Sequence, residues 1–211
     1  FQRPERALTI WGALIGIGLA IALALHVWFA GYHQRLRDNS AWTYLKAADN
    51  FDKQNNWPSA LKMLEEAIKR DKTSPIPYER MGGIYYDNKN WARSLEAFRE
   101  AIARGSRAES VRGQIMWCLI HLNQYDKAAE FGKECVKDGY TASFFPKYIA
   151  EALQRAGKQA ESIPYWEDAL KATPRDLYLL EHLLAAHEAA GNKERAAAIK
   201  KQIESFAENA K

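Results

Sequence analysis

The feature that most constrains the fold of this chain is a recurrence at a fixed distance of 34 residues. The segment NWPSALKMLEEAI begins at Asn56, and NWARSLEAFREAI begins at Asn90. The same distance leads to QYDKAAEFGKECV, KQAESIPYWEDAL and NKERAAAIKKQIE, which begin at Gln124, Lys158 and Asn192. A period of this size predicts an array of stacked structural units, each too small to bury its own apolar face.

Each unit contains two segments whose apolar residues return every three or four positions, which is the spacing of an amphipathic helix. No alternation of the β type competes with this pattern. The sequence therefore predicts an all-α solenoid of helical hairpins. Five units fit without a gap, and they cover residues 41–74, 75–108, 109–142, 143–176 and 177–210.

The order of residue sizes within a unit resembles that of the tetratricopeptide repeat (TPR), a helix-turn-helix module. The first helix of that family has a large, a small and an aromatic residue, and Met81, Gly82 and Tyr85 occupy these places in the second unit. In the third and fifth units Met116 and Leu184 stand at the small place, so these units match less closely. Small residues are also expected at two places of each second helix, held here by Ala60 and Ala67, Ser94 and Ala101, Ala128 and Cys135, Ser162 and Ala169, and Ala196 and Ile203.

A long apolar stretch, ALTIWGALIGIGLAIALALHVWFA, precedes the repeats and contains no charged residue. As a helix it would be about 36 Å long, which is enough to cross a hydrocarbon core of about 30 Å. The sequence thus predicts a membrane anchor over residues 1–33, with a span over about 7–30, and a short tether over 34–40. A cleavable signal peptide is the competing interpretation, but the apolar region is too long for one.

Small residues recur every four positions within this stretch, at Gly12, Gly16, Ala20 and Ala24. Such a stripe would let another transmembrane helix approach closely, although plain tolerance of small residues in membrane helices explains it equally well. The predicted partners of this region are a second transmembrane helix and the lipid bilayer. The predicted location is a membrane crossed once, for which a bacterial inner membrane with periplasmic repeats is one setting. The side of the membrane on which the repeats lie stays undetermined, because arginines flank both ends of the apolar stretch.

The resemblance to the TPR family implies a concave groove that binds other proteins. In the family the second, fifth, ninth, twelfth and thirteenth places of each repeat face that groove. An aromatic cluster on an open face is typical of a protein-binding anchor, whereas ordinary core packing is the alternative for each residue. The polar residues at these places include Asp49, Glu79, His121, Lys147, Gln154 and Arg155. The residues expected to bind the partner are Trp42, Tyr86, Trp117, Ile120, Phe144 and Tyr178.

One subclass of TPR groove can be argued against. Members that bind chaperone tails clamp a terminal carboxylate with lysine, asparagine and arginine side chains. At the corresponding places this chain has Leu45, Asp49, Ser110 and Gln114. Without cations there is no charge-assisted hydrogen bond to a carboxylate, so the sequence predicts no such clamp.

No motif indicates catalysis, a cofactor or a metal, so we expect a protein that is not an enzyme. His182 and His187 are five residues apart, which is the wrong spacing for one helical face. Cys118 and Cys135 lack any metal or redox pattern and are expected to be small buried residues, with their redox state left open. Nucleic acid is not an expected partner, because 30 Lys and Arg against 26 Asp and Glu leave a net charge of only +4 without a dense basic run.

Together these features predict a membrane-anchored TPR scaffold that mediates protein–protein interaction. The preferred hypothesis is an accessory subunit of a larger membrane complex. The alternative is an assembly factor or chaperone-like protein of the kind that serves cytochrome maturation, translocation or import. The partner itself is not readable from the sequence.

Overall fold

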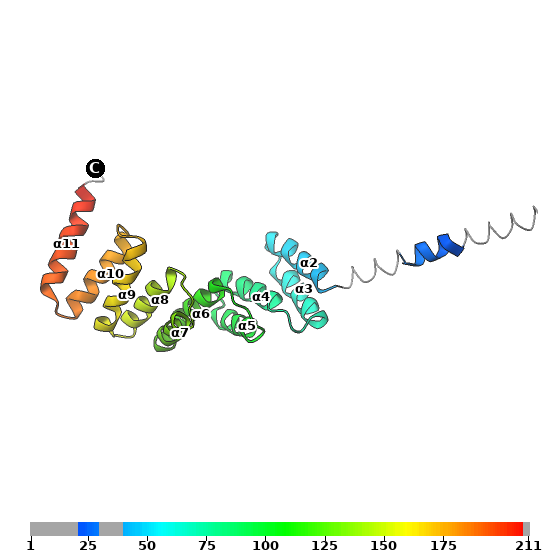
Figure 1. Cartoon of the computed structure of the whole chain (residues 1–211), viewed down its shortest axis with the longest axis horizontal. Helices are drawn as coiled ribbons and strands as arrows, with labels where there is room; N and C mark the ends of the chain where they lie inside the picture. Colours follow the sequence, from blue (N-terminus) through cyan, green and yellow to red (C-terminus); the bar gives the residue numbers. More distant parts are fainter. Residues whose placement is uncertain (1–20, 30–39, 209–211) are drawn as a thin grey trace, which may run out of the picture. The chain divides into compact units, whose positions relative to one another are not determined.

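A computed structural model of the chain describes residues 21–29 and 40–208 (Figure 1). All regular secondary structure within these ranges is helical. The chain divides into two compact units, Phe1–Lys72 and Thr73–Lys211. The all-α solenoid predicted from the periodicity is therefore confirmed for the described residues.

The first unit contains one helical hairpin, formed by α2 (Ala41–Lys53) and α3 (Trp57–Arg70). The side chain of Ser40 caps α2 by accepting a hydrogen bond from the backbone N–H of Thr43 (3.3 Å). Leu64 of α3 is fully buried between the two helices together with the small residues Ala60 and Ala67. Small residues at these places let the helix backbones approach closely, as the repeat pattern predicted.

The second unit stacks its helices in chain order, and each packs against the next (Figure 1). The first helices of neighbouring hairpins also touch, since α4 contacts α6 and α6 contacts α8. This adjacency brings residues from separate hairpins onto one continuous face. The helices are α4 (Ile76–Asp87), α5 (Trp91–Ala103), α6 (Glu109–His121), α7 (Tyr125–Lys137), α8 (Phe144–Arg155), α9 (Gln159–Ala172), α10 (Leu177–Ala189) and α11 (Lys193–Glu208).

The turn inside each hairpin has a recurring backbone conformation. A positive φ closes the first helix of every hairpin, because the chain must leave the helix through the left-handed region. Glycine adopts this conformation without steric cost, and asparagine tolerates it better than other residues do. The residues with this conformation are Asn55, Lys89, Asn123, Gly157 and Gly191, which lie 34 positions apart.

Each of the first two hairpins of the second unit pairs a small residue with a large one where its helices cross. In α4 the backbone of Gly82 lies against the ring of Phe98, where an added Cβ would clash. In α6 and α7 the order is reversed, because Met116 of the first helix lies against Gly132 of the second. Met116 departs from the family pattern, and Gly132 makes room for it.

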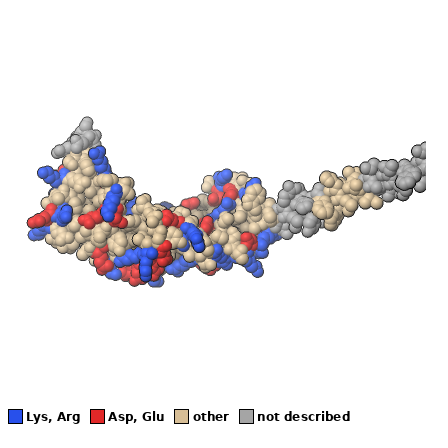
Figure 2. Space-filling view, in the orientation of Figure 1, with Lys and Arg blue, Asp and Glu red and all other residues tan. Residues whose placement is uncertain are grey.

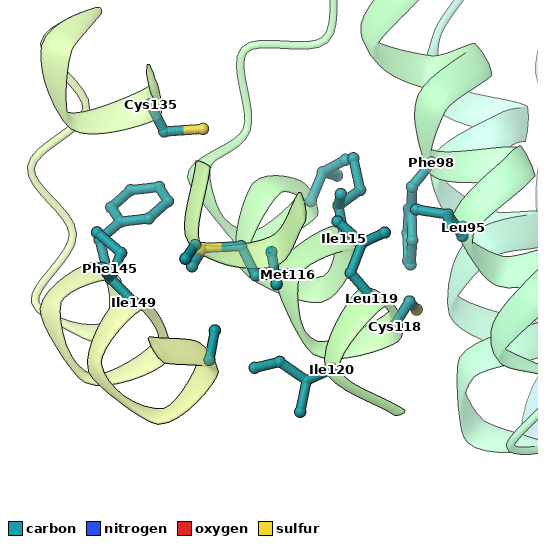
Figure 3. Packing of buried hydrophobic residues seen from close by; sticks show 14 of the residues in the cluster. Leu95, Phe98, Ile115, Met116, Cys118, Leu119, Ile120, Cys135, Phe145 and Ile149 are labelled. Atoms are coloured by element: carbon teal, nitrogen blue, oxygen red, sulfur yellow. The ribbon is translucent and has the colours of Figure 1, made fainter. Parts of the chain in front are cut away.

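The largest core cluster lies between α5, α6, α7 and α8 (Figure 3). In Figure 3 the side chains of α6 lie between Phe98 of α5 and Phe145 of α8. A second cluster joins α8 to α11 around Trp166, Leu180 and Leu183. Nine of the ten small places predicted in the second helices are buried, and only Ile203 of α11 is partly exposed.

The predicted membrane span is not found. No helix among the described residues is long and apolar enough to cross a membrane. The predicted transmembrane fold class and single-pass location are therefore wrong on this finding. Residues 21–29 are helical, and Ala24 is exposed within them. Gly12, Gly16, Ala20 and most of the predicted tether lie outside the described residues.

Candidate protein-binding groove

A continuous set of rings follows the first helices of the second unit, and we call it the aromatic row. Its neighbouring ring centroids are separated by 4.5 to 5.6 Å, within the range of favourable aromatic contacts. Every ring is only partly buried. In order along the row, the residues are Tyr86, Trp91, His121, Trp117, Tyr148 and Phe144.

Helical spacing explains how the row forms. Trp117 and His121 are one turn apart on α6, as Phe144 and Tyr148 are on α8, so each pair shares a helix face. The imidazole Nδ1–H of His121 donates to the carbonyl oxygen of Trp117 (3.0 Å), which holds the two rings together. The contact between Trp117 and Tyr148 then joins α6 to α8.

A cavity of about 200 Å³ opens beside the aromatic row, with room for one amino-acid side chain. A Cβ at Gly113 would lie 2.7 Å from the ring of Phe144, so glycine is needed for the ring to lie this close to α6. The walls carry hydroxyl and amide groups but no charge. The lining residues are Tyr86, Ser110, Gly113, Gln114, Phe144 and Tyr148.

The groove becomes polar where α8 meets α10. Glu151 is 3% exposed, and the guanidinium of Arg155 donates to its Oε1 (2.8 Å). The ammonium of Lys147 lies 4.6 Å from the centre of the Tyr178 ring. The ring of His182 contacts that of Tyr178 at 4.3 Å.

His182 is held in place from two further sides. Its ring stacks on the fully buried Trp166, with centroids 5.0 Å apart and planes 17° apart. Its Nδ1–H donates to Oε1 of Gln154 (2.9 Å). The imidazole therefore joins α8, α9 and α10 at the polar end of the groove.

Burial changes the titration of the groove side chains. It raises the pKa of Tyr86 to about 12 and raises the pKa values of Tyr148 and Tyr178. Burial also lowers the pKa of His182, although the nearby Glu151 carboxylate acts in the opposite direction. The tyrosines and His182 are consequently neutral at pH 7, so their rings present apolar faces together with hydrogen-bonding groups.

Comparison with known proteins identifies the architecture. A sequence model of the tetratricopeptide repeat family matches residues 20–206. The chain belongs to this family. A curated relative, the Protein CTR9 homolog of Arabidopsis thaliana, is 34% identical over 91 residues, which is 43% of this chain and 8% of that protein. The chain thus spans only a small part of that relative's length.

Solved TPR structures share the fold. YrrB, described as a TPR protein with an unusual peptide-binding site, superposes with a TM-score of 0.71 at 15% identity and covers 82% of this chain and 89% of its own. MamA from Desulfovibrio magneticus RS-1 has a TM-score of 0.70 at 15% identity, covering 80% of this chain and 96% of its own. At these identities the likeness shows the TPR fold alone.

The predicted TPR groove residues fall into three structural environments. Tyr86, Trp117 and Phe144 come together in the aromatic row, and Tyr178 lies at the polar end. Ile120 is 0% exposed and belongs to the core cluster, so it offers no surface to a partner. Trp42 lies in the first unit, where it is 60% exposed and the ammonium of Lys46 sits 3.6 Å from its ring centre.

Four groove residues were missing from the predicted partner-binding set. Tyr148 follows Phe144 by one helical turn, and this spacing was the signal available for it. Glu151 stands at the ninth place of its repeat, the place that Trp117 occupies in the repeat before. Trp91 and His182 reach the groove through ring contacts between helices, for which the sequence carries no simple signal.

Cys118 and Cys135 are buried, as predicted, and both are free thiols in the structure. Burial raises the pKa of Cys135 to about 11 and also raises that of Cys118, so both thiols stay protonated at neutral pH. The part of the chain that the structure describes contains no group of three or more His, Cys, Asp or Glu side chains that could hold a metal ion. Figure 2 shows acidic and basic side chains interspersed over the visible face rather than gathered by sign.

Proposed function

We propose that this chain is a TPR scaffold that binds a partner protein through the groove of its second unit. The aromatic row carries this proposal. Its rings are only partly buried, and three of them line a cavity sized for one side chain, namely Tyr86, Phe144 and Tyr148. Partly exposed aromatic residues around such a pocket are typical of the anchors that dominate binding energy at protein interfaces.

We propose five repeats with the predicted bounds, 41–74, 75–108, 109–142, 143–176 and 177–210. The positive φ values spaced by 34 residues support this division. The bound part of the partner is a peptide segment, and YrrB, a TPR protein of the same fold, is described as having an unusual peptide-binding site. A terminal carboxylate is a poor occupant, because Ser110 and Gln114 place neutral groups in the cavity wall.

We further propose that the scaffold is an accessory subunit of a larger complex. A transient assembly factor would use the same groove, so stoichiometry separates the two roles. Purification of the tagged chain from its native cells, with co-purifying chains identified and counted, provides the measurement. A fixed ratio supports the subunit, whereas substoichiometric recovery supports the assembly factor.

The groove itself is tested by Trp117→Ala. Trp117 lies mid-row and contacts both His121 and Tyr148, so its removal opens a gap at the centre of the surface. We expect the affinity for the partner to fall roughly thirtyfold, because about 2 kcal/mol of binding free energy is lost. Less of the partner should then be recovered. Circular dichroism of the same full-length protein should remain helical.

Lys171→Ala is the matched control. The side chain of Lys171 is 78% exposed on α9, where its ammonium pairs with Asp168 (2.8 Å). Its removal should change neither binding nor helicity, because exposed ion pairs contribute little. Normal binding by a folded Trp117→Ala protein would place the partner elsewhere on the chain, and loss of helicity in that variant would make Trp117 a core residue.

A further inference from the structure

The polar end of the groove contains a buried carboxylate that is only half satisfied. Oε1 of Glu151 accepts from Arg155, whereas Oε2 has no hydrogen-bond partner within the described residues. A buried carboxylate oxygen without a donor costs free energy, so such a group in a native fold calls for an explanation. A carboxylate can accept several donors at once, and Glu151 therefore has room for another.

Aromatic side chains on α8 and α10 lie near enough to this carboxylate to be affected by its charge. The charge of Glu151 acts on Tyr148 of α8 and on Tyr178 and His182 of α10. The electron-rich face of an aromatic ring attracts a cation, and the ammonium of Lys147 already occupies such a position over Tyr178. A carboxylate beside aromatic faces is a suitable environment for an ammonium or a guanidinium.

We propose that Glu151 recognises a lysine or arginine side chain of the partner segment that binds in the groove. The proposal rests on the function proposed above and names the chemistry of the partner at one place. Oε2 of Glu151 is buried in the unbound chain, so the incoming cation first displaces Lys147 from the ring face over Tyr178 and then donates to this oxygen. Lys147 moves from that ring into solvent, because two cations cannot share it.

The charges at the groove places favour a basic partner. In the four hairpins of the second unit these places hold five acidic residues, Glu79, Asp87, Glu151, Glu181 and Glu188, and two basic ones, Lys147 and Arg155. These places are thus acidic on balance, although the whole chain carries a net charge of +4. Complementary charge speeds association and selects between partners.

Two synthetic peptides test the proposal on the full-length chain. One carries a single central lysine among leucine and alanine residues, and the other carries norleucine in place of lysine. Norleucine keeps the aliphatic stem and lacks the ammonium. Backbone amide chemical shifts of α8 and α10 provide both dissociation constants, and we expect the lysine peptide to bind about tenfold more tightly.

Two variants have effects of opposite sign. Glu151→Gln keeps the shape of the side chain and should reduce the lysine preference to parity, whereas Lys147→Met should tighten binding of the lysine peptide about threefold by removing the internal competitor. Equal binding of both peptides to the native chain, absence of binding, or a lysine preference that survives Glu151→Gln would overturn the proposal. Trp117→Ala should weaken the binding of both peptides equally. A failure of the proposed groove is thereby distinguished from a failure of the proposed Glu151 contact.

Discussion

The first helices of the second unit have two faces that differ in packing more than in composition. On α6, Met116 is fully buried in the core while its neighbour Trp117 is partly exposed in the groove. On α8, Phe145 is fully buried while its neighbour Phe144 lines the groove cavity. Apolar residues therefore occupy both faces, and hydrophobicity alone does not distinguish a core from a binding surface.

What separates the two faces is the presence of a covering helix. The core face is closed by a second helix that packs closely enough for a Cβ added at Gly82 or Gly132 to clash with a buried side chain. The rings on the groove face contact one another and the edge of the core cluster, and each remains partly exposed. Close packing resists any change in volume, whereas an open row tolerates truncation.

The largest expected effect compares Phe145→Ala with Phe144→Ala. Phe145 is enclosed by the core cluster, and its truncation leaves a cavity that should cost about 3–5 kcal/mol of the free energy of unfolding. Phe144 is partly exposed, so its truncation should cost no more than about half as much but should weaken partner binding. Denaturant unfolding and a binding assay on both variants provide the comparison, and equal losses of stability would remove the distinction between the faces.

A second comparison uses two adjacent glycines of α4. An alanine Cβ at Gly82 would meet the ring of Phe98, which is fixed in the core, so Gly82→Ala should destabilise the fold by about 1–3 kcal/mol. At Gly83 an added Cβ meets nothing within 4 Å. Gly83→Ala should therefore stabilise α4 by about 0.5–1 kcal/mol through helix propensity. Thermal melts of the two variants that shift in the same direction would contradict this assignment of faces.

Much of this architecture could be predicted from the sequence because close helix crossings demand small residues at a fixed period. Ala60, Ser94, Ala128 and Ser162 mark the crossings and are all fully buried. The reversed order of large and small residues at Met116 and Gly132 was not predicted, since it depends on which residues face each other across the hairpin. Similarly, the period located residues 34 apart but could not show that the last turn of α6 buries Ile120.

The groove was predictable only in part, for a related reason. Tyr86, Trp117 and Phe144 stand at family groove places, and their rings lie in one row in the structure, but their binding of a partner stays a prediction. Glu151 was missed although it stands at a groove place of its repeat, and its 3% exposure is unusual for a carboxylate. The membrane span predicted from the apolar N-terminal stretch was wrong, because no helix among the described residues is long and apolar enough to cross a membrane.

The smallest expected effect uses His182 to measure how closely the polar end of the groove resembles the core. Burial between Trp166 and Tyr178 lowers the pKa of this imidazole below its unfolded value of about 6.5. The stability associated with neutral His182 is therefore fully present above pH 6.5 and is lost as the pH falls through the lowered pKa, because the unfolded state takes up the proton first.

The native chain should lose stability between pH 7 and pH 5, and His182→Gln should lose less over the same interval. Unfolding curves at both pH values test this difference, while the C2 proton shift of His182 reports its pKa directly. Two results together would contradict this prediction: a His182 pKa at or above 6.5, and the same pH dependence of stability in His182→Gln. They would show that water reaches the ring freely and that the polar end of the groove is solvated, unlike the core.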